Sequence, residues 1–303
     1  MEMYILEYIE EMAETKSVST VKGHKSSLLS FNEFINEFID VAEPVEVMVK
    51  DIVKFRKQQY EEKKAGTVNT MLKRIKKYFA WCVDKGYIDV SPANEVKLLT
   101  EGEQLPKWID EKQEDFLIRL VKKTYLGNDV KNKSYKQLAI ILLMLKAGLR
   151  VGEVAKLKWE EVQLIGDKGK ALIRGKAQQQ RTIPLISDVV EVLKKYREET
   201  DSEVYVFLGR NNKQMTERGI QKMVSNFKGM SNKHVNLNEL HPHVLRHTFA
   251  HNLAKQGMQL ESIARLMGHM KKDGTPNIKQ TIRYTKASDD EIGEDLERIL
   301  SLR

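Results

Sequence analysis

Six side chains of this sequence are of the types needed for chemistry on a phosphodiester bond. Arginines and a lysine can hold phosphoryl oxygens, because a guanidinium fork matches two anionic oxygens. A phenol can attack phosphorus, and imidazoles can move protons. The segments AGLRVGEVAKLKW, RGKAQQQRTIPL, HPHVLRHTFA, LMGH and TIRYT contain the six: Arg150, Lys176, His243, Arg246, His269 and Tyr284. No carboxylate cluster converges with them, so the pattern predicts a metal-free, cofactor-free reaction on DNA.

Tyr284 is the expected nucleophile, because the preceding tyrosine is Tyr205 and no other phenol follows the histidine-rich segment. A phenol has an ordinary pKa of about 10, so neighbouring cations or a base must ease its ionisation. His243 is the candidate base. It lies three residues before Arg246, so on one helix both face the same side. Lys176, on a predicted β-turn, is the candidate donor of a proton to the leaving hydroxyl.

Two glycines are expected to turn the chain toward these side chains. Gly148 ends a predicted helix just before Arg150. Gly268 would end a second helix and turn the imidazole of His269 back toward the site.

The elements that must position these residues fall into two modules. Apolar residues at helical spacing predict about four helices before Gly86, which is a stop signal. The stretch 89–107 contains two prolines and a glycine without sustained periodicity, which is typical of a linker. Short β-like pieces follow Trp159, and helices then dominate. We predict a mainly α domain over 1–97, a linker over 98–107, and an α+β domain with a small antiparallel sheet over 108–287, followed by a helical tail over 288–303.

Positive charge is concentrated in blocks, although the whole chain carries a net charge of only +8. Residues 1–49 carry 3 basic and 10 acidic side chains, whereas residues 50–77 carry 10 and 3, and residues 98–287 carry 34 and 21. Two basic surfaces gripping one duplex would give this pattern; solvated helix faces are the alternative. The candidates for DNA contact in the first block are Lys50, Lys54, Arg56, Lys57, Lys73, Arg74, Lys76 and Lys77.

Other features exclude several classes of protein. Cys82 is the only cysteine, so no disulfide can form within the chain, and a reducing compartment is expected. No secretory signal begins the sequence, and the run LAIILLML is too short to span a bilayer, so we expect a cytoplasmic protein. His247 and His251 have the i, i+4 spacing of a zinc pair, but Thr248 stands where a metalloprotease has glutamate. We therefore expect no metal, and assign these histidines to packing or to proximity to DNA.

The five segments together resemble the tyrosine recombinase, or phage integrase, family, including its Xer-like members. The resemblance covers roughly 105–287, and the helical module before it is similar to that family's core-binding, DNA-binding domain. It implies that Arg150 and Arg246 are the two catalytic arginines. It also implies that Lys176 is the hairpin lysine, with Lys168 and Lys170 as rivals on an adjacent turn.

The reaction implied by this resemblance is transesterification. Tyr284 would attack the scissile phosphate and leave a 3′-phosphotyrosyl link with a free 5′ hydroxyl. By the family's precedent, four protomers on two duplexes exchange strands through a four-way junction. The amphipathic tail DDEIGEDLERILSLR would either pack on its own domain or dock on a neighbouring protomer.

Two features depart from the family's pattern. His269 and Tyr284 are 15 positions apart, which is longer than usual, so Tyr284 is expected on a more mobile segment. AQQQR follows Lys176, where many relatives have a glycine and more charge, which leaves the conformation of that turn open.

Three classes of function remain open. The first is a site-specific recombinase: an integrase, a resolvase of chromosome or plasmid dimers, or a transposon-encoded enzyme. The second is a type IB topoisomerase, which has a similar active site but would act as a monomer. The third is a non-catalytic DNA-binding relative, against which the retention of all six residues argues.

Overall fold

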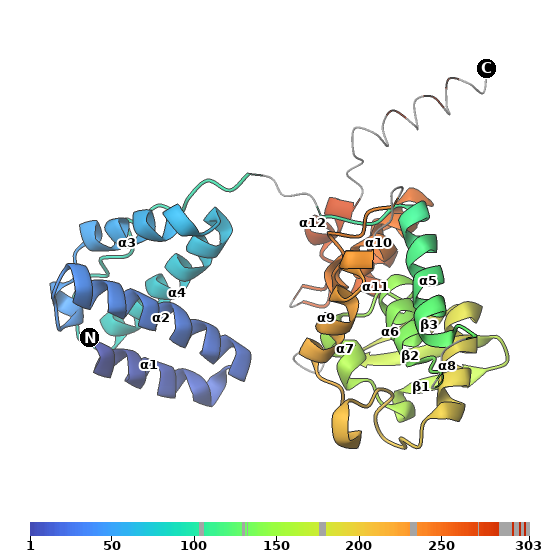
Figure 1. Ribbon diagram of the computed structural model, residues 1–303. Helices are drawn as coiled ribbons and strands as arrows, with labels where there is room; N and C mark the ends of the chain where they lie inside the picture. The colour runs from blue at the N-terminus through green and yellow to red at the C-terminus, as the bar shows by residue number, and fades with distance from the viewer. Residues whose placement is uncertain are drawn as a thin grey trace. The chain divides into compact units, whose positions relative to one another are not determined.

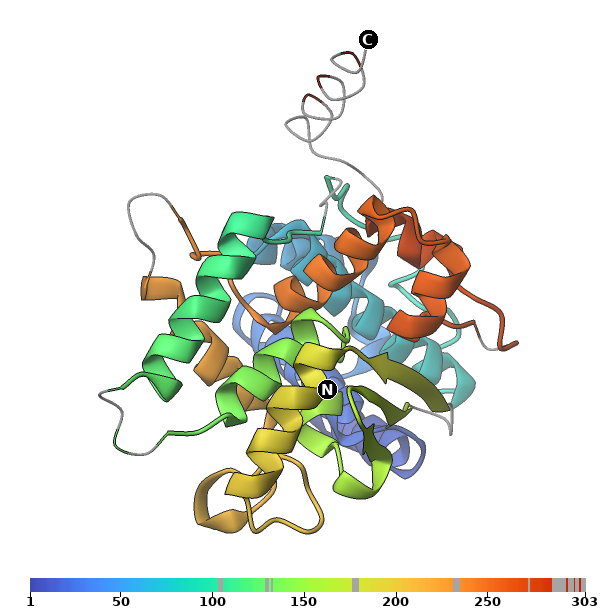
Figure 2. The same ribbon diagram turned by 90° about the vertical axis from the view of Figure 1, so that its right-hand side faces the viewer.

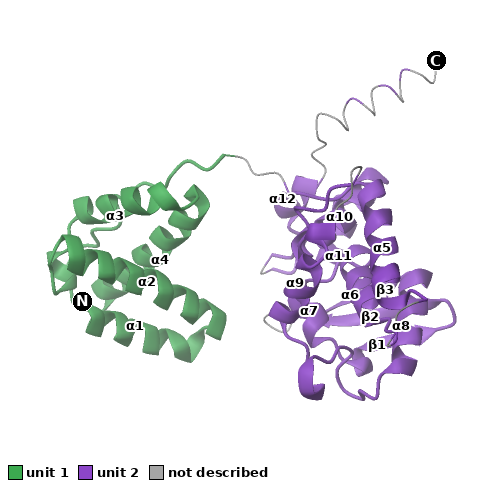
Figure 3. Cartoon of the chain, in the orientation of Figure 1, with its two compact units in different colours: residues 1–103 green, residues 104–303 purple. Residues whose placement is uncertain are grey.

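A computed structural model of the chain describes most residues of two compact units, residues 1–103 and 104–303 (Figure 3). The described residues are 1–102, 106–128, 131, 133–175, 180–230, 235–271, 273–284, 293, 297 and 300. The predicted fold class, mainly helical with a small antiparallel sheet, is confirmed (Figure 1). No helix among the described residues is both long and apolar enough to cross a membrane.

The N-terminal unit is a helical bundle with an aromatic core. The ring of Phe31 lies 5.1 Å from that of Phe55 and 6.1 Å from that of Phe79, centroid to centroid. The backbone at Gly86 is left-handed (φ +76°) where the last helix stops, as its sequence predicts. The helices are α1 (Glu2–Thr15), α2 (Val18–Phe38), the 3-10 helix η1 (Pro44–Glu46), α3 (Val49–Glu62) and α4 (Ala65–Asp84).

Residues 99–101, in the stretch predicted as a linker, are bound to the N-terminal unit. The side-chain amide of Asn69 on α4 donates to the carbonyl of Leu99 at 2.9 Å and to Oε1 of Glu101 at 2.6 Å. Its oxygen accepts from the backbone N–H of Leu99 at 2.8 Å. A buried asparagine thus holds the end of this unit.

The C-terminal unit is built around α6 (Lys136–Leu145), in which every residue from Leu138 to Leu145 is buried. A helix that is apolar on all sides lies inside a core, and α8 and α10 pack on it. The helices before the sheet are α5 (Glu111–Leu126), α6, α7 (Val151–Lys156) and η2 (Trp159–Glu161). Those after it are α8 (Ser187–Glu199), η4 (Arg210–Asn212), α9 (Glu217–Ser225), η5 (Lys228–Met230), α10 (Pro242–Lys255), α11 (Leu260–Met267), α12 (Ile278–Thr281) and η6 (Ile282–Tyr284).

Three antiparallel strands form the sheet in the order β1 (Val162–Ile165), β2 (Lys168–Arg174) and β3 (Gln180–Leu185). Along β2, Ala171 and Ile173 are buried, as the two-residue period of a strand requires. They pair with Ile183 and Arg181 of β3. The helix α8 packs on β2 and α11 packs on β3; Figure 2 shows the strands beside the yellow helix α8.

Gly148 makes the turn between α6 and α7 with a left-handed backbone (φ +66°). A Cβ atom at this position would lie 2.3 Å from Cδ1 of Phe249 on α10. Two constraints therefore require a glycine at the predicted helix end: the left-handed backbone angle and the closeness of α10.

We predict that Gly148→Ala destabilises the protein more than Gly257→Ala does. Gly257 also has a positive φ (+80°), but a Cβ there meets nothing within 4 Å. In both variants the left-handed backbone lowers the free energy of unfolding by about 1–2 kcal/mol. In Gly148→Ala, steric overlap lowers it by about 1–3 kcal/mol more. Urea unfolding of the two variants measures the difference. Equal losses would contradict the close approach of Phe249.

Candidate active site

Arg150 is the N-terminal cap of α7, and its guanidinium binds a carboxylate of this helix and the backbone that follows α11. Its Nη1 donates to Oε1 of Glu153 at 2.9 Å, and its Nη2 donates to the carbonyl of Gly268 at 3.4 Å. Its side chain keeps 37% of its surface exposed. Arg150 is thus anchored and still accessible to an anion from solvent.

Arg246 is the most deeply buried cation of the site, with a side chain only 4% exposed on α10. Its Nη1 donates to the carbonyl of Gly148, and its Nη2 donates to the carbonyl of Met267. Burial, together with the charge of Arg150, lowers the pKa of Arg246 to about 9. The group remains a cation at neutral pH, and a buried cation favours an anionic partner.

Glu153 joins three arginines, although neither Glu153 nor Arg181 was predicted from the sequence. Arg181 on β3 donates from both terminal nitrogens to the two oxygens of Glu153, each at 2.8 Å. Nη1 of Arg246 lies 3.8 Å from the same carboxylate. Burial acts to raise the pKa of Glu153, but the hydrogen bonds and charge of Arg181, with those of Arg150, outweigh it and lower the pKa to about 2. One negative charge among three positive ones leaves a net positive pocket.

A signal for Glu153 is present in the sequence. The spacing Arg150-x-x-Glu153 is that of a capping box, and the carboxylate accepts from the backbone N–H of Arg150 at 2.7 Å. The capping pattern predicts this local bond, but the partnership with Arg181 spans 28 residues and requires the folded sheet.

His269 follows the left-handed Gly268 (φ +62°) at the end of α11, as predicted. Its Nδ1 lies 3.2 Å from Oγ1 of Thr281, whose own hydroxyl donates to the carbonyl of Asn277. Thr281 therefore accepts from Nδ1–H, which leaves Nε2 with its lone pair. Burial, with the charges of Arg246 and Arg150, lowers the pKa of His269 to about 3 and keeps the ring neutral.

His243 lies in the first turn of α10, one turn before Arg246, as predicted. Burial and the charges of Arg246 and Arg150 lower its pKa, so this imidazole is also neutral at pH 7. A neutral imidazole can accept a proton.

Tyr284 is 6% exposed and lies among histidines at the end of the chain's described helices. Its ring is 5.4 Å from that of His247 and 6.0 Å, nearly parallel, from that of His269. Burial raises the pKa of its phenol, against the opposing charges of Arg246, Arg283 and Arg150. The hydroxyl is therefore protonated in the free protein.

The long insert before Tyr284 is a turn closed by backbone hydrogen bonds. Met270 pairs with Pro276, and the backbone N–H of Lys271 donates to the carbonyl of Thr275 at 2.8 Å. The N–H of Asn277 donates to the carbonyl of His269 at 2.7 Å, and α12 begins there. The sequence predicted a more mobile Tyr284; the structure shows this residue packed against α10 and α11.

Lys176 lies outside the described residues, but the structure places its rivals. Lys168 and Lys170 are exposed at the start of β2, near the turn to β1. Arg181 pairs with Ile173 near the other end of β2. Five residues of strand separate Lys168 from that end, roughly 17 Å. The β2–β3 hairpin, which contains Lys176, is therefore the turn nearer the arginines.

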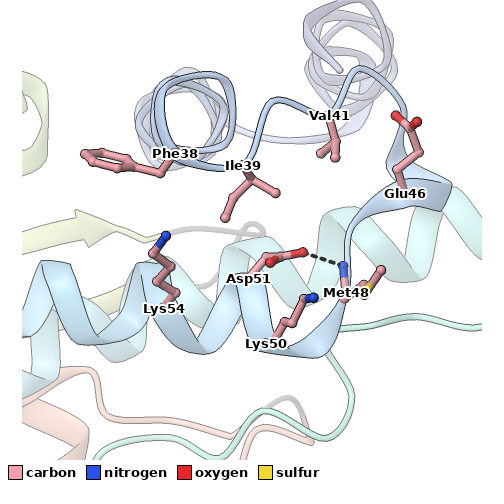
Figure 4. Close-up of a pocket in the computed structure, with 8 residues that line it drawn as sticks. All are labelled: Phe38, Ile39, Val41, Glu46, Met48, Lys50, Asp51 and Lys54. Carbon is pink, nitrogen blue, oxygen red and sulfur yellow. Dashed lines mark hydrogen bonds between the residues drawn. The ribbon is translucent and has the colours of Figure 1, made fainter.

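The basic candidates of the N-terminal unit divide into exposed and bound residues. Lys50 and Lys54 on α3 line a hollow beside Phe38 and Met48 (Figure 4). Nζ of Lys54 lies 5.7 Å from the centre of the Phe38 ring. The exposed candidates are Lys50, Lys54, Lys57, Lys73 and Lys77. Those bonded within the unit are Arg56, to the carbonyl of Lys97; Arg74, to Oγ of Ser27; and Lys76, to the carbonyl of Asn94.

His247 and His251 do not form a metal site with other ligands. Among the residues that the structure describes, no three of His, Cys, Asp and Glu converge as a metal site would require. His251 instead stacks on Trp108, and its Nδ1 lies 3.1 Å from the carbonyl of Tyr284.

Comparison with known proteins identifies the family. The phage integrase family matches residues 107–291, and the phage integrase SAM-like domain matches residues 3–98. This chain belongs to the phage integrase family. The family assignment made from the sequence is thus confirmed.

Individual relatives are distant but extend over nearly the whole chain. A tyrosine recombinase of Agathobacter rectalis is 26% identical over 299 residues, 95% of this chain and 94% of that protein. Tyrosine recombinase XerC of Neisseria meningitidis serogroup B is 27% identical over 296 residues, 95% of this chain and 92% of that protein.

Solved structures with this fold include enzymes bound to DNA. The Tn1549 transposon integrase in complex with a circular intermediate DNA has a TM-score of 0.73 at 17% identity, covering 97% of this chain and 99% of that one. The XerH site-specific recombinase in a post-cleavage complex has a TM-score of 0.74 at 16% identity, covering 97% and 83%. At this identity, the likeness is one of fold.

We predict that Glu153→Gln lowers the free energy of unfolding at pH 7, because three guanidinium groups lose their shared anion. A carboxyl whose pKa is lowered on folding stabilises the protein above its unfolded pKa, near 4.3, and loses this effect as the pH falls toward about 2. The gap between the wild type and the variant should therefore narrow from pH 6 to pH 3. Urea unfolding across this range measures it.

Glu160→Gln is the matched control, because Glu160 is 62% exposed and pairs only with surface cations. This change should cost little at any pH. If the difference in free energy of unfolding between the wild type and Glu153→Gln is the same at pH 6 and pH 3, the carboxylate of Glu153 is not ionised as we predict.

Proposed function

We propose that this chain is a site-specific DNA recombinase that cleaves and rejoins strands through a 3′-phosphotyrosyl intermediate. The observation that carries the proposal is the cluster in which Arg150, Arg181 and Arg246 surround the carboxylate of Glu153. The ring of Tyr284 lies 6.0 Å from that of His269, which follows Gly268, whose carbonyl binds Arg150. Membership of the phage integrase family supports it. The arginines of this cluster are suited to bind a scissile phosphate, and Tyr284 is suited to act as the nucleophile.

In the proposed reaction, the phenol oxygen of Tyr284 attacks phosphorus, and the bond from phosphorus to the 5′ oxygen breaks. The phenol proton passes to a neutral imidazole. His243 was the candidate from the sequence. The ring of His269 also lies 6.0 Å from that of Tyr284, and the ring of His243 lies 6.2 Å from that of His247, which is 5.4 Å from Tyr284. We assign the acceptor to the pair His243 and His269.

The remaining steps need an acid and a second strand. The departing 5′ oxygen takes a proton, which we assign to Lys176 on the β2–β3 hairpin. Arg150 and Arg246 hold the non-bridging oxygens as their charge grows. A 5′ hydroxyl of another duplex then attacks the phosphotyrosine and restores a phosphodiester. One ester replaces another of similar energy, so the exchange requires neither ATP nor a divalent metal.

The proposed partner of the N-terminal unit is the recombination-site duplex. Its exposed lysines, Lys50, Lys54, Lys57, Lys73 and Lys77, are suited to phosphates, which fix register without reading sequence. We propose a tetramer on two duplexes, with the tail 288–303 docking on a neighbouring protomer; this tail lies almost wholly outside the described residues. Cys82, a buried free thiol, supports a cytoplasmic location.

Tyr284→Phe is expected to abolish the covalent protein–DNA band on nicked suicide duplexes taken from the DNA that flanks the gene. The band should form with the wild type in EDTA, because no metal takes part. Tyr205→Phe is the matched control and should cleave normally. Arg150→Ala and Arg246→Ala should bind the duplex but lose cleavage by about a hundredfold or more.

The following outcomes would contradict this assignment. A covalent band with Tyr284→Phe would remove Tyr284 from the reaction. Activity that appears only when magnesium or zinc is added would remove the metal-free mechanism. Relaxation of supercoiled plasmid without any exchange between two duplexes would instead indicate a topoisomerase.

Deletion of residues 289–303 is expected to leave DNA binding largely intact and to abolish synapsis of two duplexes in native gels. The reason is the apolar stripe of Ile292, Leu296 and Ile299, which would dock on a second protomer. Glu297→Gln leaves this stripe unchanged and serves as the control. Strand exchange by the truncated protein would contradict the docking role.

A further inference from the structure

Two consecutive residues at the start of the C-terminal unit contact one face of α10. The N–H of Ile109 donates to Oγ1 of Thr248 at 3.0 Å. The ring of Trp108 stacks on that of His251, with centroids 4.0 Å apart and planes within 10°. We refer to residues 108–109 as the strap.

Thr248 and His251 lie three residues apart on α10, so Ile109 and Trp108 each have their own partner on that helix. The strap is therefore bound to α10 at both of its residues.

His251, which binds the strap, also contacts Tyr284, as does its neighbour His247. Nδ1 of His251 lies 3.1 Å from the carbonyl oxygen of Tyr284. A carbonyl only accepts, so Nδ1–H of His251 is the donor. The ring of His247 lies 5.4 Å from that of Tyr284. Strap and nucleophile thus contact the same imidazole, that of His251, and α10 also packs against η6, which ends at Tyr284.

We propose that His251, held in place by Trp108, is a positioning residue for the nucleophile. The proposal rests on the proposed role of Tyr284. The bond from Nδ1 fixes the backbone of Tyr284, and so keeps its phenol oxygen at the pocket of Arg150 and Arg246. The strap locks the imidazole plane, because a stacked ring cannot rotate without losing its contact with Trp108.

Core packing alone does not account for the contacts of Trp108 and His251. A histidine that only fills the core needs no bond to the carbonyl of the attacking residue, and an exposed linker tryptophan needs no parallel ring. Trp108 is only half-buried. Its stack is therefore a contact that strap movement would break.

The test separates the donor from the stack in the full-length chain. His251→Phe keeps a ring for Trp108 but loses the Nδ1 donor, whereas Trp108→Ala keeps the donor and loses the stack. Each should slow formation of the covalent band on nicked suicide duplexes by about tenfold or more under single-turnover conditions, because misplacement of a nucleophile by about 1 Å costs this much. DNA affinity in gel shifts should not change.

Coupling between the two residues has its own signature. Because Trp108 and His251 both act by holding Tyr284 in position, the double variant should cleave no more slowly than the slower single variant. His251→Asn, whose Nδ2–H takes the place of Nδ1–H, should recover part of the rate lost in His251→Phe. Trp159→Ala is the matched control: Trp159 stacks on Arg197 in another part of the unit and should cleave normally.

A substrate with sulfur in place of the bridging 5′ oxygen gives a readout that general loss of structure would not. A thiolate leaves without a proton, so Lys176→Ala should recover on this substrate, whereas His251→Phe should remain slow. Wild-type rates in His251→Phe and Trp108→Ala, multiplicative losses in the double variant, or recovery of His251→Phe on the sulfur substrate would each overturn the inference. A covalent band with Tyr284→Phe would overturn the proposed function instead.

Discussion

The carboxylate of Glu153 allows three guanidinium groups, one of them open to solvent, to lie close together. Without it, the charges of Arg150, Arg181 and Arg246 would repel one another where little water screens them. With it, each arginine has a nearby anion, and the pocket as a whole still lacks negative charge. The phosphate of a phosphodiester would supply the missing negative charge. The same ion cluster therefore stabilises the unit and prepares it for a polyanion.

The buried arginine depends as much on helix ends as on this carboxylate. Arg246 donates to the carbonyls of Gly148, just after α6, and Met267, the last residue of α11. The carbonyl of Met267 is at a helix C-terminus, where carbonyls lack partners within the helix and carry the negative end of its dipole. The guanidinium of Arg246 therefore satisfies the end of α11 and also binds the turn that follows α6. The left-handed glycines Gly148 and Gly268 are what bring these two ends together.

Local sequence signals predicted the elements, and long-range contacts explain what they missed. The helix ends at Gly148 and Gly268 and the shared helix of His243 and Arg246 follow from spacing within a few residues. Arg181 did not stand out, because its partnership with Glu153 exists only once β3 lies beside α7. His251 was noted only for its spacing from His247 and was assigned to packing or proximity to DNA, because its stacking partner, Trp108, is separated from it by most of the C-terminal unit. Periodicity found the basic helices of the N-terminal unit, but not that Arg56, Arg74 and Lys76 bind within it.

Burial of Tyr284 determines when its oxygen becomes nucleophilic. The phenol is kept protonated in the free protein, because desolvation raises its pKa more than the nearby arginines lower it. Negative charge can therefore develop on this oxygen only while it is passing to phosphorus and to the oxygens held by Arg150 and Arg246. His269, kept neutral by burial and by the charges of the same arginines, is a proposed acceptor of the proton during that transfer. In the proposed reaction, the cations that bind the phosphate therefore act together with burial to keep the imidazole able to accept this proton.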